Sequence, residues 1–222
     1  MARELLGQKP ELVIAVFALE EWLSRVEEAA DVAAEKLFPV SGAALRRISG
    51  LDTPNQVLVV SSIPNTGIAA GQVENSLSLY LDGIQDPGNF GTILRIADWF
   101  GIGCVFTSAG CVDPYNPKVV QASMGSLLRV ACAEASLEAL HREYPALPVY
   151  GAVMDGENIF KAGLDKAKGI IVIGNEGRGL SPEAERFLSH RISIPRAAQS
   201  RAESLNAAIA AGILCAVFTN VH

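Results

Sequence analysis

The sequence predicts an α/β protein whose mostly parallel sheet carries helices on both faces. Short apolar runs that suit strands alternate with helical patterns over most of the chain, which is the order that builds a parallel sheet. The clearest strand, residues 170–173, consists only of β-branched residues, as is typical of a strand buried on both sides. Half of the 222 residues are hydrophobic and 19% are charged, so the chain can fill a substantial core.

Residues 1–72 read as a small α/β domain. We expect, in order, a strand at 12–17, a helix through Trp22 and Val26, a helix at 43–48 and a strand at 57–61. Residues 61–76 contain Pro64, Gly67 and Gly71 and are typical of a linker.

Residues 73–222 form the larger predicted domain. We expect its strands at 77–81, 104–107, 127–131, 149–153, 170–173 and 191–194. We expect its helices at 92–100, 118–124, 137–143, 183–188 and from about Leu205 onward.

The composition argues against several classes of protein. No run of about 20 uncharged apolar residues occurs, so we expect no membrane span. The first residues lack a basic segment followed by an apolar run, which argues against a signal peptide and for a cytoplasmic protein. The four cysteines and three histidines lack the paired spacing of a zinc site. We therefore expect no metal, and reduced cysteines are favoured over disulfides.

The net charge of −6 does not advertise a nucleic-acid partner, but the charge is unevenly spread. Residues 1–75 carry six basic and ten acidic groups, whereas residues 178–201 carry five arginines against two glutamates. The basic stretch is either an ordinary solvated face or a surface that meets an anionic partner.

Residues 81–101 place two polar side chains near one edge of the sheet. A strand end and a turn at Asp86–Asn89 lead into a helix that carries Arg95 in its second turn. Each has a plain structural explanation, since Asn89 can cap the helix and Arg95 can be solvated. Alternatively, an arginine at this place can hold a phosphate or polarise a hydroxyl.

A second pattern, Gly174, Glu176, Gly177 and Gly179, follows the strand at 170–173. Ligands of α/β sheets bind at the carboxyl ends of strands, and glycines let the backbone approach them closely. The order G-x-x-G-x-G is not the dinucleotide-binding order, so it is weak support for a Rossmann cofactor. Glu176 either belongs to a site or only accepts hydrogen bonds from nearby backbone N–H groups.

The third pattern lies in residues 202–218. Ser204 is the expected N-cap of the last helix, which is apolar all round and should be buried by the domain or by a second subunit. A capped core helix explains everything except Asn206, whose amide needs a hydrogen-bond partner.

In this order, the three patterns resemble the SpoU (TrmH-like) branch of the SPOUT RNA methyltransferases. The family's motifs are an Asn followed by an Arg, a G-x-E-G-x-G strand end and a terminal S-L-N helix. The matching residues are Asn89 and Arg95, then Gly174, Glu176, Gly177 and Gly179, then Ser204, Leu205 and Asn206. Residues 113–126 look like the family's segment between the first two motifs. Residues 1–72 resemble a shortened form of the RNA-recognition domain that often precedes it, without its usual first strand.

The resemblance implies a C-terminal trefoil knot, an obligate homodimer and transfer of a methyl group from S-adenosylmethionine to a ribose 2′-hydroxyl. It gives the cofactor contacts to Gly174, Glu176, Gly179, Ile194 and Leu205. It gives the catalytic roles to Arg95, Asn89, Glu176, Ser204 and Asn206. Arg95 would act at the hydroxyl, although its permanent charge makes it a poor simple base.

The chain departs from the family in the link before S-L-N. Residues 196–202 form a longer, glycine-free segment with two arginines, so cofactor contacts there are an open question. Arg196 and Arg201 join Arg95 as candidates for binding RNA.

The leading hypothesis is a 2′-O-ribose methyltransferase that acts on structured RNA, with ribosomal RNA favoured over transfer RNA. A non-catalytic RNA-binding dimer is an alternative, although all five polar motif residues are present. An unrelated nucleotide-binding α/β protein would leave the joint occurrence of the motifs unexplained.

Overall fold

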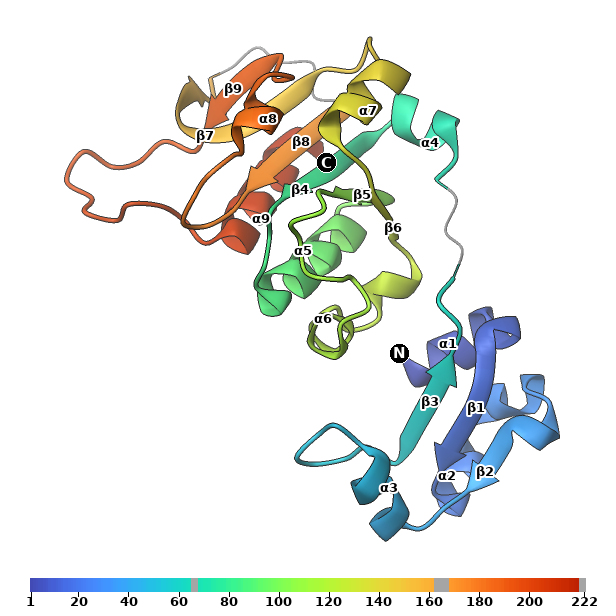
Figure 1. Ribbon diagram of the computed structural model, residues 1–222. Coiled ribbons are helices and arrows are strands. Elements are labelled where there is room, and N and C mark those ends of the chain that lie inside the picture. Colours follow the sequence, from blue (N-terminus) through green and yellow to red (C-terminus); the bar gives the residue numbers. More distant parts are fainter. Residues whose placement is uncertain (65–67, 162–167, 220–222) are drawn as a thin grey trace. The chain divides into compact units, whose positions relative to one another are not determined.

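The chain folds into two compact units, Met1–Asn65 and Thr66–His222 (Figure 1). The structure, a computed structural model, describes residues 1–64, 68–161 and 168–219. The sequence predicts the division after residue 72, inside an expected linker, but helix α4 (Ala70–Glu74) lies there. Its Val73 is fully buried in a core cluster of the second unit, which explains why this helix belongs to that unit.

The first unit is a three-stranded sheet in the order β2-β1-β3. Its strands are β1 (Val13–Ala18), β2 (Leu37–Pro39) and β3 (Val57–Ser61). Its α-helices are α1 (Ala2–Gln8), α2 (Glu20–Arg25) and α3 (Gly42–Ile48), and its 3-10 turns are η1 (Pro10–Leu12), η2 (Glu27–Asp31) and η3 (Ala34–Lys36). The predicted strand at 57–61 and helix at 43–48 are confirmed. Helix α2 ends before Val26, whose backbone is extended and whose side chain is buried.

The second unit contains a six-stranded sheet in the order β6-β5-β4-β8-β7-β9, with every neighbouring pair parallel. The strands are β4 (Leu77–Asp82), β5 (Cys104–Thr107), β6 (Ala131–Glu134), β7 (Val149–Asn158), β8 (Gly169–Gly174) and β9 (His190–Ser193). The helices are α5 (Pro87–Trp99), α6 (Pro117–Ala122), α7 (Leu137–Glu143), α8 (Pro182–Glu185) and α9 (Ala207–Thr219), with the 3-10 turn η4 (Ser126–Leu128). The predicted parallel α/β fold is confirmed.

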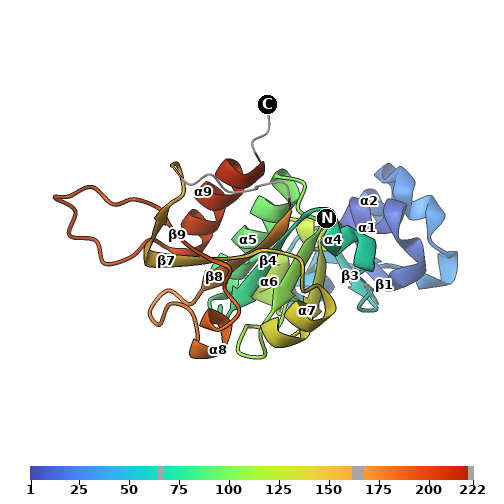
Figure 2. The same cartoon turned by 90° about the horizontal axis from the view of Figure 1, so that it is seen from above.

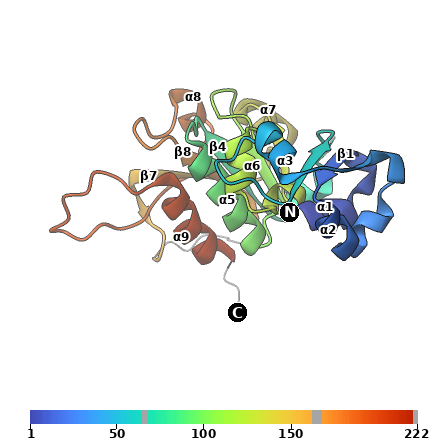
Figure 3. The ribbon, with the colours of Figure 1, turned by 90° about the horizontal axis from the view of Figure 1, so that it is seen from below.

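Helices cover both faces of this sheet, as the sequence predicts. Figures 2 and 3 show α5 and α9 on one side and α7 and α8 on the other. The strands alternate accordingly, because Leu79 and Leu81 pack with α5 and α9 while Tyr80 packs with α7 and α8. The threading that would define a trefoil knot stays a prediction.

Three predicted bounds are wrong for identifiable reasons. The strand expected at 127–131 begins only at Ala131, because Gly125, at φ 98°, leads residues 126–128 into a 3-10 turn. Helix α5 starts at Pro87 instead of residue 92, because the Asp86 carboxylate accepts the Asn89 N–H and Pro87 fits the first helical position. The last helix begins at Ala207 and not at Leu205.

Among the described residues, no helix is long and apolar enough to cross a bilayer. The same part of the chain holds no group of three or more His, Cys, Asp or Glu side chains arranged to bind a metal ion. The four cysteines are free thiols, and burial raises the pKa of Cys104 to about 11. Such a thiol stays protonated and unreactive at neutral pH.

Candidate functional site

A cleft of about 590 Å³ opens beside the ends of β7, β8 and β9 and the start of α9. This is the region where open α/β sheets bind their ligands. All five residues expected to contact a cofactor line the cleft, namely Gly174, Glu176, Gly179, Ile194 and Leu205. Ser204 and Arg196 line it as well, whereas Arg95, Asn89, Asn206 and Arg201 do not.

One wall of the cleft is the glycine turn, residues 174–180, which follows β8. Asn175 and Gly179 exchange two backbone hydrogen bonds of 3.0 and 2.9 Å, and Gly179 has a φ of 71°, where glycine is favoured. A Cβ atom on Gly174 would lie 2.5 Å from the carbonyl carbon of Gly179. Gly174 therefore permits the closure of the turn itself, a different reason from the expected approach of backbone to a ligand.

Two polar residues that the sequence reasoning missed anchor this turn to the end of β4. The Asn175 amide donates to the Gly83 carbonyl at 2.9 Å and accepts from the N–H groups of Gly177 and Arg178 at 3.0 and 3.1 Å. The Asp82 carboxylate accepts from the Ser181 N–H at 2.6 Å. An Asn inside a glycine run is a known turn former and was the available signal for Asn175. The Asp82 contact spans 99 positions and left no local signal.

A chain of three side chains joins the three sequence motifs. The Asn206 amide donates to the Asn89 side-chain carbonyl at 2.9 Å, and the Asn89 amide donates to the Glu176 carboxylate at 2.5 Å. The partners come from the starts of α9 and α5 and from the glycine turn. Residues that lie 87 and 117 positions apart in the sequence thus form one hydrogen-bonded network at the rim of the cleft.

The same network corrects two expected helix caps. The Asn206 side-chain oxygen accepts from the N–H groups of Ala208 and Ile209 at 3.0 and 3.2 Å. Asn206 rather than Ser204 therefore caps α9, and this answers how its amide is satisfied. At α5 the capping residue is Asp86, which leaves the Asn89 side chain free to bridge Asn206 and Glu176.

Arg95 does not join this network within one chain. It follows Asn89 by six residues, so the two side chains point about 120° apart around α5. Arg95 is exposed, and within the described part of the chain no hydrogen bond or ion pair engages it. Arg95 is therefore open to solvent and is not one of the residues that line the cleft of its own chain.

The link between β9 and α9 forms the other wall of the cleft. Figures 1 and 3 show it as a long loop that projects from the domain. Residues 196–199 and 201–206 are all exposed. Arg196 donates to the Ala202 carbonyl at 2.9 Å, while Arg201 is exposed and lies off the cleft. Sequence reasoning also missed Arg191, a cleft residue paired with Asp155 at 2.8 Å and Glu185 at 3.2 Å.

Comparison with known proteins places this geometry in a family. Residues 76–216 match the model of the SpoU rRNA Methylase family. The chain is 28% identical over 179 residues to the 23S rRNA (guanosine(2553)-2′-O)-methyltransferase RlmP of Bacillus subtilis, covering 80% of this chain and 70% of the relative. The chain spans 65% and 70% of the lengths of the first two curated relatives that it matches.

Solved structures agree with this assignment. An RNA methyltransferase of the TrmH family from Porphyromonas gingivalis, described as putative, superposes with a TM-score of 0.83 at 37% identity, covering 97% of this chain and 86% of that one. An AdoMet-bound rRNA methyltransferase from Sinorhizobium meliloti superposes with a TM-score of 0.84 at 25% identity, covering 99% and 85%. The chain belongs to the SpoU rRNA methylase family.

Proposed function

We propose that this protein is an S-adenosylmethionine-dependent methyltransferase that modifies a ribose 2′-hydroxyl in structured RNA, with ribosomal RNA as the favoured substrate. The observation that carries the proposal is the network of Asn206, Asn89 and Glu176, which unites the three motifs beside the cleft. The relative from Bacillus subtilis is named for 2′-O-methylation of 23S rRNA, which supports both the reaction and the substrate class.

The residues of the cleft fit S-adenosylmethionine. Its volume of about 590 Å³ lies in the usual range for a small-molecule site. Ile173, Ile194 and Leu214 offer an apolar wall for an adenine ring, and Glu176 and Glu203 offer carboxylates toward positive charge. The cofactor supplies a methyl group on a sulfonium. The AdoMet-bound relative from Sinorhizobium meliloti supports this choice.

The chain's own residues would orient the ribose hydroxyl, a weak nucleophile at neutral pH. Glu176 accepts the Asn89 amide on one carboxylate oxygen, which leaves the other oxygen for a hydroxyl donor. Asn206 holds Asn89 in place while it caps α9. Ser204, at the mouth of the cleft, is a further hydroxyl that can contact the substrate.

We infer that the working enzyme is a homodimer. Arg95 points away from the network of its own chain, so it can act at a hydroxyl only in the site of a second copy. The solvent-facing side of α5 also carries Trp99, which is 84% exposed, and α9 presents Ile209, which is 56% exposed. A second copy packed on these side chains would bury them, consistent with a last helix that has no polar face.

The RNA contacts are part of the same proposal. Arg95, Arg196 and Arg201 are exposed cations that can bind phosphate, and the small unit Met1–Asn65 would recognise the RNA. An RNA substrate also supports a cytoplasmic location. The alternatives are a transfer RNA substrate and a non-catalytic RNA-binding dimer, and the experiment must distinguish them from the proposed function.

The test is methyl transfer from labelled S-adenosylmethionine to unmodified transcripts of 16S rRNA, 23S rRNA and transfer RNA, with the product nucleoside identified by mass spectrometry. We expect a 2′-O-methylated nucleoside in ribosomal RNA. The matched variant is Asn206→Ser, because serine keeps a good helix cap but removes the amide donor to Asn89. It should fold, bind the cofactor and lose turnover. RNA binding without any methyl transfer by the wild type would favour the non-catalytic dimer.

A further inference from the structure

The turn between α6 and η4 contains a backbone conformation that residues with side chains rarely adopt. Met124 has a φ of 51°, and it is the one residue other than glycine with a positive φ in the described ranges. Its side chain is 68% exposed, so it fills no space in the core. A glycine would adopt this conformation without strain. Here the left-handed backbone carries an exposed apolar side chain instead, and such outliers gather at ligand contacts.

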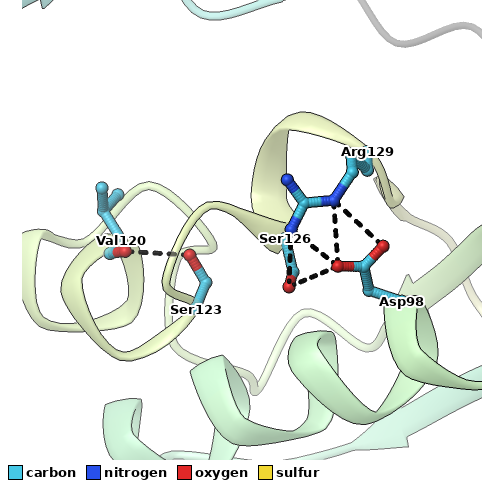
Figure 4. A network of polar contacts seen from close by, with 5 residues as sticks. All are labelled: Asp98, Val120, Ser123, Ser126 and Arg129. Atoms are coloured by element: carbon cyan, nitrogen blue, oxygen red, sulfur yellow. Dashed lines mark hydrogen bonds and ion pairs between the residues drawn. The ribbon is translucent and has the colours of Figure 1, made fainter. Parts of the chain in front are cut away.

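This turn is fastened on its η4 side by a polar network (Figure 4). The Asp98 carboxylate, on α5, accepts from the Ser126 hydroxyl at 2.8 Å and from Arg129 at 2.7 to 3.1 Å. The Ser123 hydroxyl donates to the Val120 carbonyl at 2.8 Å. Met124 lies between these two anchored serines, and its own N–H donates to the Gln121 carbonyl at 3.3 Å, so backbone contacts hold the turn while the Met124 side chain stays exposed.

The turn is also pressed against α5 at a second point. A Cβ atom on Gly91 would lie 2.5 Å from the Cβ of Ala122 and 2.9 Å from the Ser123 nitrogen. The α6–η4 segment therefore touches α5 at Gly91 and at Asp98, which lie four residues before and three residues after Arg95. On a helix, residues three or four apart share a face. Arg95 thus lies beside the Met124 turn, on the exposed border of the face that the turn covers.

We propose that Met124 is an RNA-contact residue that packs against a nucleobase next to the ribose or phosphate held by Arg95. This rests on the proposed function, because Arg95 meets RNA only if the protein binds it. A thioether suits the task, since methionine sulfur packs well against aromatic rings and its flexible side chain adapts to different bases. Contact with the base would add affinity and help to fix the register of the strand over Arg95.

The test compares Met124→Gly, Met124→Asn and Met124→Leu with the wild type, using an unmodified 23S rRNA transcript. Glycine and asparagine accept the left-handed backbone but remove the apolar side chain, whereas leucine keeps apolar bulk on the same backbone. RNA dissociation constant, methyl transfer, cofactor affinity, melting temperature and dimer dissociation are measured for each.

We expect the Gly and Asn variants to bind RNA roughly 10-fold more weakly, as for loss of one apolar contact in a recognition site. Their melting temperatures should be no lower than that of the wild type, and their cofactor affinity and dimer dissociation should be unchanged. The Leu variant should bind RNA nearly as the wild type does.

Normal RNA affinity in the Gly and Asn variants would overturn the proposal, as would a loss of affinity that follows dimer dissociation, since Met124 would then pack on the second copy. If the wild type binds the transcript without methylating it, the catalytic part of the proposed function fails while the binding comparison still decides the role of Met124. A wild type that binds no RNA refutes both.

Discussion

The two walls of the cleft are held by the chain in very different ways. The glycine turn is closed by the paired bonds of Asn175 and Gly179 and tied to β4 through Asn175 and Asp82. The link between β9 and α9 has Arg196 bound to Ala202 across it, and most of its residues face solvent. One wall is therefore fixed to the sheet by side-chain hydrogen bonds, whereas the other is an exposed link that we expect to adjust when a ligand binds.

The same division runs through the candidate catalytic residues. Glu176, Asn89 and Asn206 are fixed by bonds to one another, whereas Arg95 and Arg201 stand exposed without such bonds among the described residues. Preorganised groups lose little entropy when a substrate binds. Exposed cations instead attract a large anionic partner electrostatically. The comparison thus separates a preorganised group, which would position the ribose hydroxyl beside the cleft, from exposed cations, which would contact RNA phosphates.

The largest expected effect lies in the exposed part, at Arg95. Arg95→Lys keeps the positive charge but loses the planar fork of donors, so it should restore little activity. We expect a loss of turnover on the order of 10² or more for both Arg95→Lys and Arg95→Ala, the scale of proton-transfer and electrostatic groups. Single-turnover methyl transfer measures it.

Cofactor affinity and dimerisation serve as the controls for Arg95. Neither should change, because Arg95 lies outside the cleft and makes no hydrogen bond or ion pair with the described residues of its own chain. Near-normal rates in both variants would remove Arg95 from the reaction and weaken the case for a site shared between two copies.

The fixed wall is tested by adding a single methyl group. Gly174→Ala would force a Cβ against the Gly179 backbone, and we expect the turn to open to relieve it. An overpacking cost of ~1–3 kcal/mol that only the closed turn bears corresponds to roughly 5- to 150-fold weaker cofactor binding, measured by calorimetry with S-adenosylmethionine. Gly177→Ala is the matched control, since its Cβ would meet only the Asn175 side-chain oxygen, at 3.7 Å. Equal affinities for the two variants would show that closure of the turn does not shape the cleft.

Asp98, which holds the turn after α6 through Ser126 and Arg129, gives a prediction about how stability depends on pH. Hydrogen bonds from Arg129 lower the pKa of the Asp98 carboxyl, so its stabilisation is present above the unfolded pKa of about 3.9 and is lost as the pH falls through the folded value. Asp98→Asn should therefore lower stability at pH 7 by about 1 kcal/mol and by less in acid. Melting curves at pH 7 and pH 3 check this, with the exposed Asp52→Asn as control. A difference that stays constant between the two pH values would contradict the linkage.

Much of the fold was predictable because local patterns decide it. The strands at 57–61 and 104–107 and the helix at 137–143 have the predicted bounds, since apolar runs there end at polar or turn-forming residues. The structure of residues 126–131 could not be predicted in this way. Their apolar side chains suit a strand, but Asp98, about thirty positions away, holds Ser126 and Arg129 in a turn. Helix α1 and strand β2 were also missed. They are short, and β2 is defined by its pairing with β1.

The candidate site shows the same limit. The resemblance selected Asn89, Glu176 and Asn206, which the structure brings into one network. The resemblance did not predict the hydrogen bonds that these residues make. The capping of α9 by Asn206, for example, depends on where that helix begins. The resemblance also gave no direction to Arg95, since the side of α5 that faces solvent is set by the packing of α6 and α9.

The smallest effect is expected at the adjustable wall. Changing both Arg196 and Arg201 to Ala should leave cofactor affinity nearly unchanged, because the link contributes few fixed contacts to the cleft. If both arginines meet phosphates, the slope of log RNA affinity against log salt should fall by about 1.5 for the pair, as each neutralised phosphate adds about 0.7–0.9 to it. The matched control is Arg142→Ala with Arg186→Ala at α7 and α8, which removes the same charge from the opposite face of the large sheet. Binding measured between 50 and 200 mM salt separates the two pairs. An unchanged salt slope for Arg196 and Arg201 would show that the link is an ordinary solvated loop that does not contact RNA. The two walls would then differ only in how firmly the chain holds them.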